Sequence, residues 1–190
     1  KMPCPSGLIR SISRKLKQGA RRWTDLLATV GIRRRSLSKK SVLIVNLGAI
    51  GDFILSLETM KGFRQLYSQD KHIITLIGNE IWSPLAEQIG IANHCIFINL
   101  DRFKRNLPYR FSVMRQVRKR NYDIAINTAY SRRYETNDAL IVMSGAQERV
   151  GLCGDWKNIS VRDKKKSDQW YTRLICDDGE MTALNHNRLL

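Results

Sequence analysis

Long apolar runs are absent from this 190-residue sequence, and acidic residues are scarce. No stretch approaches the roughly 18 consecutive apolar residues that span a bilayer, so we expect no transmembrane helix. Residues 1–40 also lack the continuous apolar segment of a secretory signal. Only 17 Asp and Glu residues oppose 33 Lys and Arg residues, which gives a formal net charge of +16. The apolar content of 43% still predicts a folded protein, because a disordered chain lacks that capacity for burial.

Cysteine and histidine are also rare. The four cysteines, at positions 4, 95, 153 and 176, form no CxxC pair, and the three histidines do not cluster with them. This spacing argues against a zinc site, and a chain of this length does not need disulfides to be stable. We therefore expect no metal site, and small buried or idle thiols in a reducing compartment.

The positive charge is concentrated at one end of the chain. Residues 1–40 contain 12 Lys and Arg and a single acid, Asp25, whereas residues 41–190 contain 21 basic and 16 acidic residues. Most of the basicity therefore belongs to an amino-terminal arm, and the remainder of the chain is only mildly basic.

Within this arm, apolar residues recur close to the 3.6-residue period of a helix. They are Leu8, Ile9, Ile12, Leu16, Trp23, Leu26, Leu27 and Val30. The pattern predicts a basic amphipathic helix, and residues 33–40 read as an exposed linker. Three interpretations remain open: a helix in the headgroup plane of an anionic membrane, a helix packed on the domain, or a nucleic-acid-binding arm.

From residue 41, short apolar runs alternate with segments of helical periodicity. Continuous β-branched runs are typical of strands buried on both faces of a parallel sheet, and their alternation with helices predicts βαβ units. The expected strands are 41–46, 73–77, 95–98, 122–126 and a start at 149–150; the expected helices are 53–67, 81–89, 108–119 and 136–143. This predicts an α/β fold, a Rossmann-like parallel sheet with flanking helices. We assign 1–40 to the arm and linker, 41–180 to the Rossmann-like domain, in which 151–178 is less regular, and 181–190 to the start of a further helix.

The first turn after a strand carries the most informative motif, Asn46-Leu-Gly48-Ala-Ile-Gly51-Asp52. In open parallel sheets, ligands bind beyond the carboxyl ends of the strands. The GxxG spacing lacks the third glycine of a dinucleotide fingerprint, and the Asp52 carboxylate would repel a pyrophosphate at the helix start. Two roles remain open for Asp52: a helix N-cap, or a general base that takes a proton from an acceptor hydroxyl.

The segment VLIVNLGAIGDFILSL at 42–57 resembles the amino-terminal motif of the ADP-heptose:lipopolysaccharide heptosyltransferases, glycosyltransferase family 9. The resemblance continues at 74–79, 82–86, 122–126 and 145–151, and more faintly at 180–190. Two positions depart from the family pattern. The family usually has Arg or Lys where this chain has Asn46, which weakens phosphate recognition at the loop, and it often has Pro in place of Glu58.

The resemblance implies the amino-terminal, acceptor-side half of an inverting glycosyltransferase of the GT-B type, with two Rossmann-like domains. Asp52 maps onto the proposed catalytic base, and Gly48 and Gly51 onto the glycines that shape its loop. The donor, ADP-heptose, would bind a carboxy-terminal domain beyond residue 190, so this chain alone should be inactive. The acceptor would be a lipopolysaccharide core or related anionic glycolipid, at the cytoplasmic side of the inner membrane. No metal or other cofactor is implied.

Arginines supply further candidate binding residues, because a guanidinium can clamp phosphate in a bidentate manner. Arg132 and Arg133 follow the fourth expected strand on the ligand side of the sheet, although a solvated helix start would explain them equally well. Arg102, Lys104 and Arg105 follow the third strand and carry a weaker version of this argument.

Two alternative functions remain. One is a non-catalytic Rossmann-like binding protein, or a degenerate relative that lacks the donor domain. The other is nucleic-acid binding through the basic arm, although the sequence lacks the interleaved aromatic residues of a single-strand binding platform.

Overall fold

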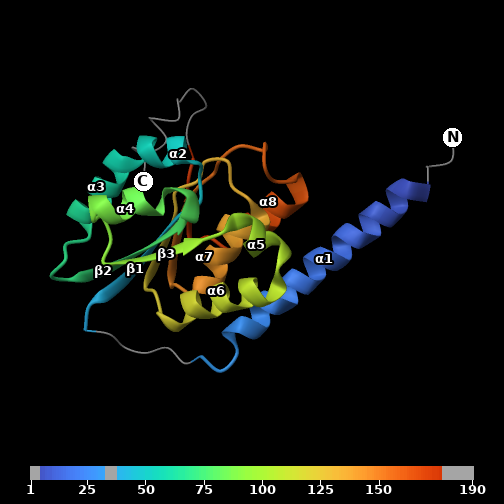
Figure 1. Cartoon of the computed structure of the whole chain (residues 1–190), viewed down its shortest axis with the longest axis horizontal. Helices are drawn as coiled ribbons and strands as arrows, with labels where there is room; N and C mark the ends of the chain where they lie inside the picture. Colours follow the sequence, from blue (N-terminus) through green and yellow to red (C-terminus); the bar gives the residue numbers. More distant parts are fainter. Residues whose placement is uncertain (1–4, 33–37, 177–190) are drawn as a thin grey trace.

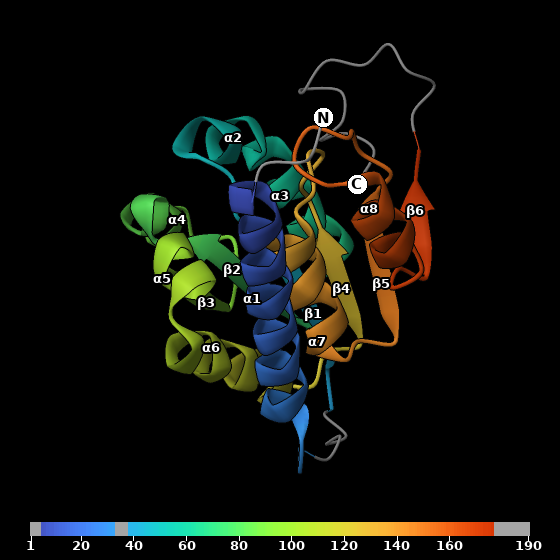
Figure 2. The same cartoon turned by 90° about the vertical axis from the view of Figure 1, so that its right-hand side faces the viewer.

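The computed structural model describes residues 5–32 and 38–176, and the side chains from residue 16 onward within these ranges. The described part contains one parallel sheet between layers of helices (Figure 1). Its strand order, β3-β2-β1-β4-β5-β6, can be followed in Figure 2. From β1 the chain adds β2 and β3 on one side of the sheet and then returns to add β4, β5 and β6 on the other side, as in Rossmann folds. This topology confirms the predicted fold class. The strands are β1 (Lys40–Asn46), β2 (His72–Asn79), β3 (His94–Ile98), β4 (Ile124–Asn127), β5 (Glu148–Leu152) and β6 (Arg173–Ile175).

Helices cover both faces of the sheet because its central strands are apolar on both sides. On β1, Leu43 and Val45 pack toward α5 (Leu100–Arg105), α6 (Leu107–Lys119) and α7 (Ala139–Ser144). Val42 and Ile44 pack on the opposite face, toward α2 (Ile50–Leu55), α3 (Leu57–Leu66), the 3₁₀ turn η1 (Glu80–Trp82) and α4 (Ser83–Ile89). All four side chains are fully buried, as the continuous apolar run predicted.

The helix expected over 53–67 is interrupted at Ser56, which separates α2 from α3. The Ser56 hydroxyl donates a 2.8 Å hydrogen bond to the Phe53 carbonyl, and its backbone N–H bonds the carbonyls of Asp52 and Phe53. Serine side chains compete with the helical hydrogen-bond ladder in this way. The expected helix 136–143 is similarly divided, into a π-helical turn η2 (Tyr134–Asp138) and α7.

Two elements lie where the sequence reads as irregular. Helix α8 (Val161–Asp168) is almost entirely polar, so it has no apolar period to detect. Its start is fixed instead by Ser160, whose hydroxyl oxygen accepts a 3.1 Å hydrogen bond from the Asp163 N–H. Strand β6 has three residues and pairs with β5. The helix expected at 181–190 lies outside the described residues.

Helix α1 (Pro5–Thr29) lies against the domain, beside α6 and α7 (Figure 2). Of the three interpretations of the arm, packing on the domain is therefore observed for the carboxy-terminal part of this helix. The amino-terminal part of α1 projects past the body of the domain (Figure 1).

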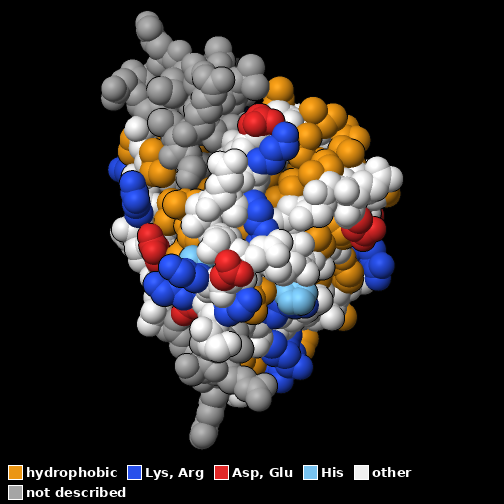
Figure 3. Space-filling model, turned by 90° about the vertical axis from the view of Figure 1, so that its left-hand side faces the viewer, with side chains coloured by type: hydrophobic (Ala, Val, Ile, Leu, Met, Phe, Trp, Pro, Cys, Tyr) orange, Lys and Arg blue, Asp and Glu red, His pale blue; other side chains and the backbone are white. Residues whose placement is uncertain are grey.

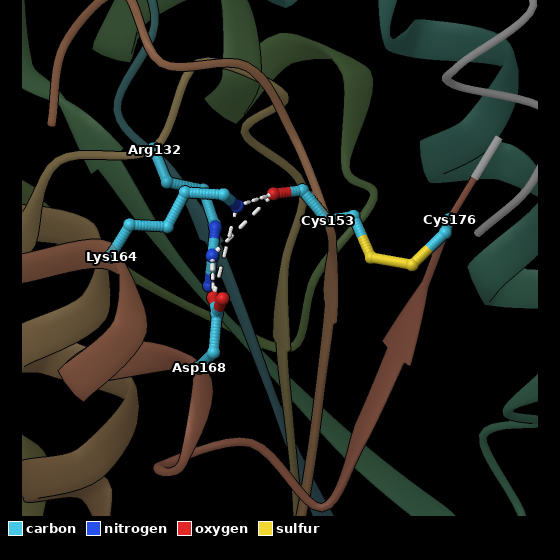
Figure 4. The surroundings of a disulfide bond; sticks show 5 residues. All are labelled: Arg132, Cys153, Lys164, Asp168 and Cys176. Atoms are coloured by element: carbon cyan, nitrogen blue, oxygen red, sulfur yellow. Dashed lines mark hydrogen bonds and ion pairs between the residues drawn. A yellow bond between two sulfur atoms is a disulfide. The ribbon is translucent and has the colours of Figure 1, made fainter. Parts of the chain in front are cut away.

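The expectation of idle cysteines is wrong for one pair, because Cys153 and Cys176 form a disulfide (Figure 4). Leu152 pairs with Ile175 across β5 and β6, so the next residue on each strand also lies side by side, with Cα atoms 4.9 Å apart. The two cysteines are 23 residues apart in the chain. The sequence did not predict their pairing because β6, the strand that brings Cys176 beside Cys153, was not expected. Cys95 is a half-buried free thiol, and Cys4 lies outside the described residues.

Candidate functional site

The loop after β1 begins at Asn46, at the carboxyl edge of the sheet. Asn46 is buried; its amide nitrogen donates a 2.9 Å hydrogen bond to the Ser56 hydroxyl, and its Oδ1 accepts a 3.3 Å bond from the Gly48 N–H. Both polar ends of this side chain are therefore bonded within the loop. Asn46 shapes the loop and does not face a ligand.

Asp52 is an exposed residue in the first turn of α2. Its Oδ2 accepts a 3.1 Å hydrogen bond from the N–H of Ala49, which is the N-cap residue of this helix. Asp52 thus lies three residues after the N-cap, not at the N-cap itself, and bonds back to it. The carboxylate still faces solvent, so the same side chain is available to accept a proton from a hydroxyl. Its catalytic role remains a prediction.

Gly48 lies directly beside Asp52. A Cβ atom at Gly48 would stand 2.7 Å from the Asp52 Cβ and 2.9 Å from its Oδ2, closer than non-bonded atoms approach. A Cβ at Gly51 would meet nothing within 4 Å. The two glycines of the motif therefore differ: Gly48 is required for the close approach of Asp52, whereas Gly51 has no steric requirement.

Trp82, from η1, packs against the loop that carries Gly48. Its indole N–H donates a 3.1 Å hydrogen bond to the Gly48 carbonyl, and its ring stacks on Phe53 with centroids 4.0 Å apart. The ring lies across Gly78, where any Cβ would collide with it. The sequence analysis did not identify Trp82 as a support of this loop, because its partner Gly48 is 34 residues away in the chain.

Arg132 occupies a buried position where the sequence led us to expect an accessible phosphate clamp. Its guanidinium forms an ion pair with Asp138. It also forms an ion pair with Asp168, and one nitrogen donates to the Cys153 carbonyl (Figure 4). Lys164 reaches the same carbonyl. This buried cation is balanced by carboxylates, so Arg132 acts within the fold, and any effect on a ligand is indirect.

The cluster also shifts the ionisation of its neighbours. Burial, followed by the nearby Arg132 charge, lowers the pKa of Lys164. Burial and the Asp138 carboxylate raise the pKa of Tyr171 well above its ordinary value of 10.0. The Tyr171 hydroxyl donates a 2.7 Å hydrogen bond to Asp138 and accepts one of the same length from Asn127. These bonds join β4, η2 and the turn between α8 and β6, which contains Tyr171, and they fix the loop that carries the next arginine.

Arg133, unlike Arg132, is exposed. It lines a pocket of about 240 Å³ together with Lys104, Thr136 and Ser160, and two carboxylates, Glu135 and Asp163, also line this pocket. These side chains follow the carboxyl ends of β3, β4 and β5, which the parallel sheet gathers at one edge. Two candidates for phosphate binding, Arg133 and Lys104, therefore share one pocket, which Asp52 does not line.

Apolar side chains surround Asp52 on the surface. Ile50, Ile54 and Leu55 of α2 and Ile81 of η1 are each at least 43% exposed. Figure 3, which shows the face on the left-hand side of Figure 1, has hydrophobic side chains gathered at its upper right, and Lys and Arg side chains interspersed with acidic and uncharged ones elsewhere. A ligand with an apolar portion would suit this surface better than a fully hydrated one.

Within 5–32 and 38–176, no three His, Cys, Asp or Glu residues converge on a point where they could hold a metal ion. In the same ranges, none of the helices has the length and apolar character needed to cross a bilayer.

Comparison with known proteins supports the fold. No protein-family model and no curated protein sequence matches the chain. Among solved structures, E. coli heptosyltransferase WaaC with ADP is similar at 18% identity and a TM-score of 0.60, over 78% of this chain and 45% of that one. The same enzyme with ADP-2-deoxy-2-fluoro heptose matches at 18% identity and 0.60, over 78% and 46%. A glycosyl transferase family 9 protein from Veillonella parvula DSM 2008 matches at 16% identity and 0.61, over 82% and 41%. The chain thus spans less than half the length of these proteins, and the likeness identifies its fold as that of one part of such glycosyltransferases.

Proposed function

We propose that this chain is the acceptor-side part of an inverting, heptosyltransferase-like glycosyltransferase. It would serve transfer of a sugar from a nucleotide-sugar, ADP-heptose, to a lipopolysaccharide core or related glycolipid. The observation that carries this proposal is the exposed Asp52 carboxylate, fixed beside Gly48 at the carboxyl edge of β1 in this fold. The solved neighbours with ADP and an ADP-heptose analogue support a nucleotide-sugar donor.

In the proposed reaction, Asp52 acts as the general base. It takes the proton of an acceptor hydroxyl while that oxygen attacks the anomeric carbon of the donor. The bond from this carbon to the nucleoside diphosphate breaks, and the diphosphate leaves with the electron pair. Attack opposite the leaving group inverts the anomeric configuration. The donor would be held by a part of the protein that this chain does not span, at the cytoplasmic side of the inner membrane.

Arg133 and Lys104 would contribute to acceptor binding. Their shared pocket offers two cations to a phosphate group of an anionic glycolipid, next to the carboxylates of Glu135 and Asp163. The apolar surface of α2 would accept the less polar part of the same molecule. Both contacts lie on the edge of the sheet where Asp52 is located.

The test is an Asp52→Asn variant of the full-length protein, assayed for sugar transfer and donor binding. We expect transfer to fall by about 10²–10⁴-fold, the usual contribution of a general base, while donor affinity stays the same. Asp70→Asn is the matched control, because Asp70 is also exposed but precedes β2, at the amino-terminal ends of the parallel strands and away from Asp52. Retained turnover in Asp52→Asn would remove Asp52 from the mechanism. Glycolipid binding without transfer by the unmodified protein would instead favour a non-catalytic binding role.

A further inference from the structure

Helix α1 contacts the domain through its polar face, the reverse of the usual arrangement for an amphipathic surface helix. Asp25 is buried and accepts two 2.6 Å hydrogen bonds from the Nε and Nη2 atoms of Arg110 on α6. Arg21 forms an ion pair with Glu135 of η2, and Ala28 is fully buried. These contacts fix the rotation of the helix about its axis.

The apolar face of α1 consequently points away from the domain. Leu16, Trp23, Leu27 and Val30 are 68%, 67%, 56% and 62% exposed, and Leu26 beside them is 52% exposed. The spacing of the first four, at positions i, i+7, i+11 and i+14, places them on one line along the helix. We call these five residues the outer α1 face.

Basic side chains flank the outer α1 face on both sides. Lys17 and Arg22 are exposed and lie about 100° and 120° around the helix from Leu16, in opposite directions. Among the side chains of α1 that the structure describes, the one acid is Asp25, which Arg110 neutralises. The face is therefore an apolar ridge between two cations.

A pocket of about 480 Å³ opens beside this ridge, between α1 and α7. Its apolar walls include Trp23 and Leu26 of α1, Val142 and Met143 of α7, and Trp170, and Arg22 also lines it. The pocket thus shares Trp23 and Leu26 with the outer α1 face, and its lining also includes the charged residues of the contact between α1 and the domain: Arg21, Asp25, Arg110 and Glu135.

We infer that the outer α1 face and this pocket dock on an anionic lipid bilayer. Trp23 would sit at the boundary between headgroups and acyl chains, Lys17 and Arg22 would contact lipid phosphates, and the pocket would take part of one acyl chain. The combination of an apolar ridge with flanking positive charges favours an anionic bilayer over the other possible partners. A second copy would bring the same cations together, and a nucleic acid would leave the apolar ridge unpaired. The inference does not depend on the chemistry of Asp52.

Vesicle binding by the 190-residue chain tests this inference. We expect binding to phosphatidylcholine vesicles that contain a quarter phosphatidylglycerol, weakening as salt is added, and about tenfold weaker binding to pure phosphatidylcholine. Trp23→Ser with Leu27→Ser should weaken binding to the anionic vesicles by about tenfold or more, since less apolar area is buried. The matched control is Leu66→Ser with Trp156→Ser, two residues that are similarly exposed on other elements and should leave binding unchanged.

A second pair of variants distinguishes attraction by the two cations beside the outer α1 face from attraction by the net positive charge of the whole chain. Lys17→Glu with Arg22→Glu should reduce binding by about tenfold, whereas Arg162→Glu with Lys165→Glu on α8 changes the net charge equally and should have little effect. Equal losses in the two charge variants would overturn the inference. So would absent vesicle binding together with a dimer, seen by light scattering, that Trp23→Ser and Leu27→Ser dissociate. All these residues are exposed, so unchanged thermal unfolding will show that the variants are folded.

Discussion

The position of Asp52 depends on contacts made by residues that carry no charge. Gly48 permits the close approach of the carboxylate, Trp82 holds the Gly48 carbonyl, and Asn46 anchors the start of the loop. Each contact restricts the backbone from which Asp52 projects. A carboxylate held in this way can meet an acceptor hydroxyl without first losing conformational freedom.

The difference between the two motif glycines gives a test on this scale. Gly48→Ala should displace the Asp52 carboxylate, because the new methyl group would stand 2.7 Å from the Asp52 Cβ. We expect transfer by the full-length protein to fall by about 10- to 100-fold, since small misplacements of catalytic groups have effects of this size. The isolated chain should also unfold at a lower temperature.

Gly51→Ala is the control for this substitution. The added methyl group meets no atom within 4 Å, and alanine is favoured over glycine inside a helix by about 0.5–1 kcal/mol. Thermal unfolding should therefore shift upward and transfer should change little. Equal losses from both substitutions would show that the glycine contact with Asp52 does not matter.

The GxxGD spacing after a buried strand directed attention to Gly48, Gly51 and Asp52, but it left two roles open for Asp52. The general-base role comes from the family resemblance and remains a prediction. The supporting contacts of Trp82 and Ser56 were not foreseen. Asn46 was noted as the position where the family has Arg or Lys, and Arg132 was selected as a phosphate contact; both are buried. Whether a polar side chain faces a ligand or its own loop depends on partners distant in sequence, such as Asp168 for Arg132, and these cannot be read from local spacing.

At the scale of elements, the predictions were accurate for strands and helices whose buried apolar residues form a strong pattern in the sequence. The central strands and α6 were located within one or two residues because their apolar patterns are strong. Helix α8 was missed because its contacts are made by Lys164 and Ser167, which are buried polar residues. The helical period also located α1, but the period alone could not tell which face contacts the domain.

The contact between α1 and α6 should contribute strongly to stability through Asp25 and Arg110. Asp25→Asn removes the charge that balances a buried guanidinium, and removing one partner of such a pair lowers stability by about 3–5 kcal/mol. Glu58→Gln is the matched control, because it breaks the exposed Glu58–Lys61 pair and should change stability by less than about 0.5 kcal/mol. Urea unfolding of the 190-residue chain measures both. Similar small effects would mean that α1 is not held by this pair.

At the scale of the whole molecule, the sheet ends in a short strand that needs support. Strand β6 has three residues and lies at the edge after β5, where few backbone hydrogen bonds secure it. The Cys153–Cys176 disulfide joins the ends of these two strands, and Arg132 and Lys164 hold the Cys153 carbonyl from the other side (Figure 4). The edge of the sheet is therefore connected to the buried charge cluster.

This arrangement predicts that reduction destabilises the chain. A cross-link between residues 23 apart restricts the unfolded chain, and the loop-entropy estimate is about 3 kcal/mol. Cys153→Ser with Cys176→Ser should lower the free energy of unfolding in urea by about this amount, and dithiothreitol should lower that of the wild type equally while leaving the double variant unchanged. Cys95→Ser, the control, removes a free thiol and should keep the response to dithiothreitol. Thiol titration in denaturant should find two more reactive groups in the wild type after reduction than before. Identical unfolding curves with and without dithiothreitol would contradict a stabilising disulfide and leave β6 secured by backbone pairing with β5 alone.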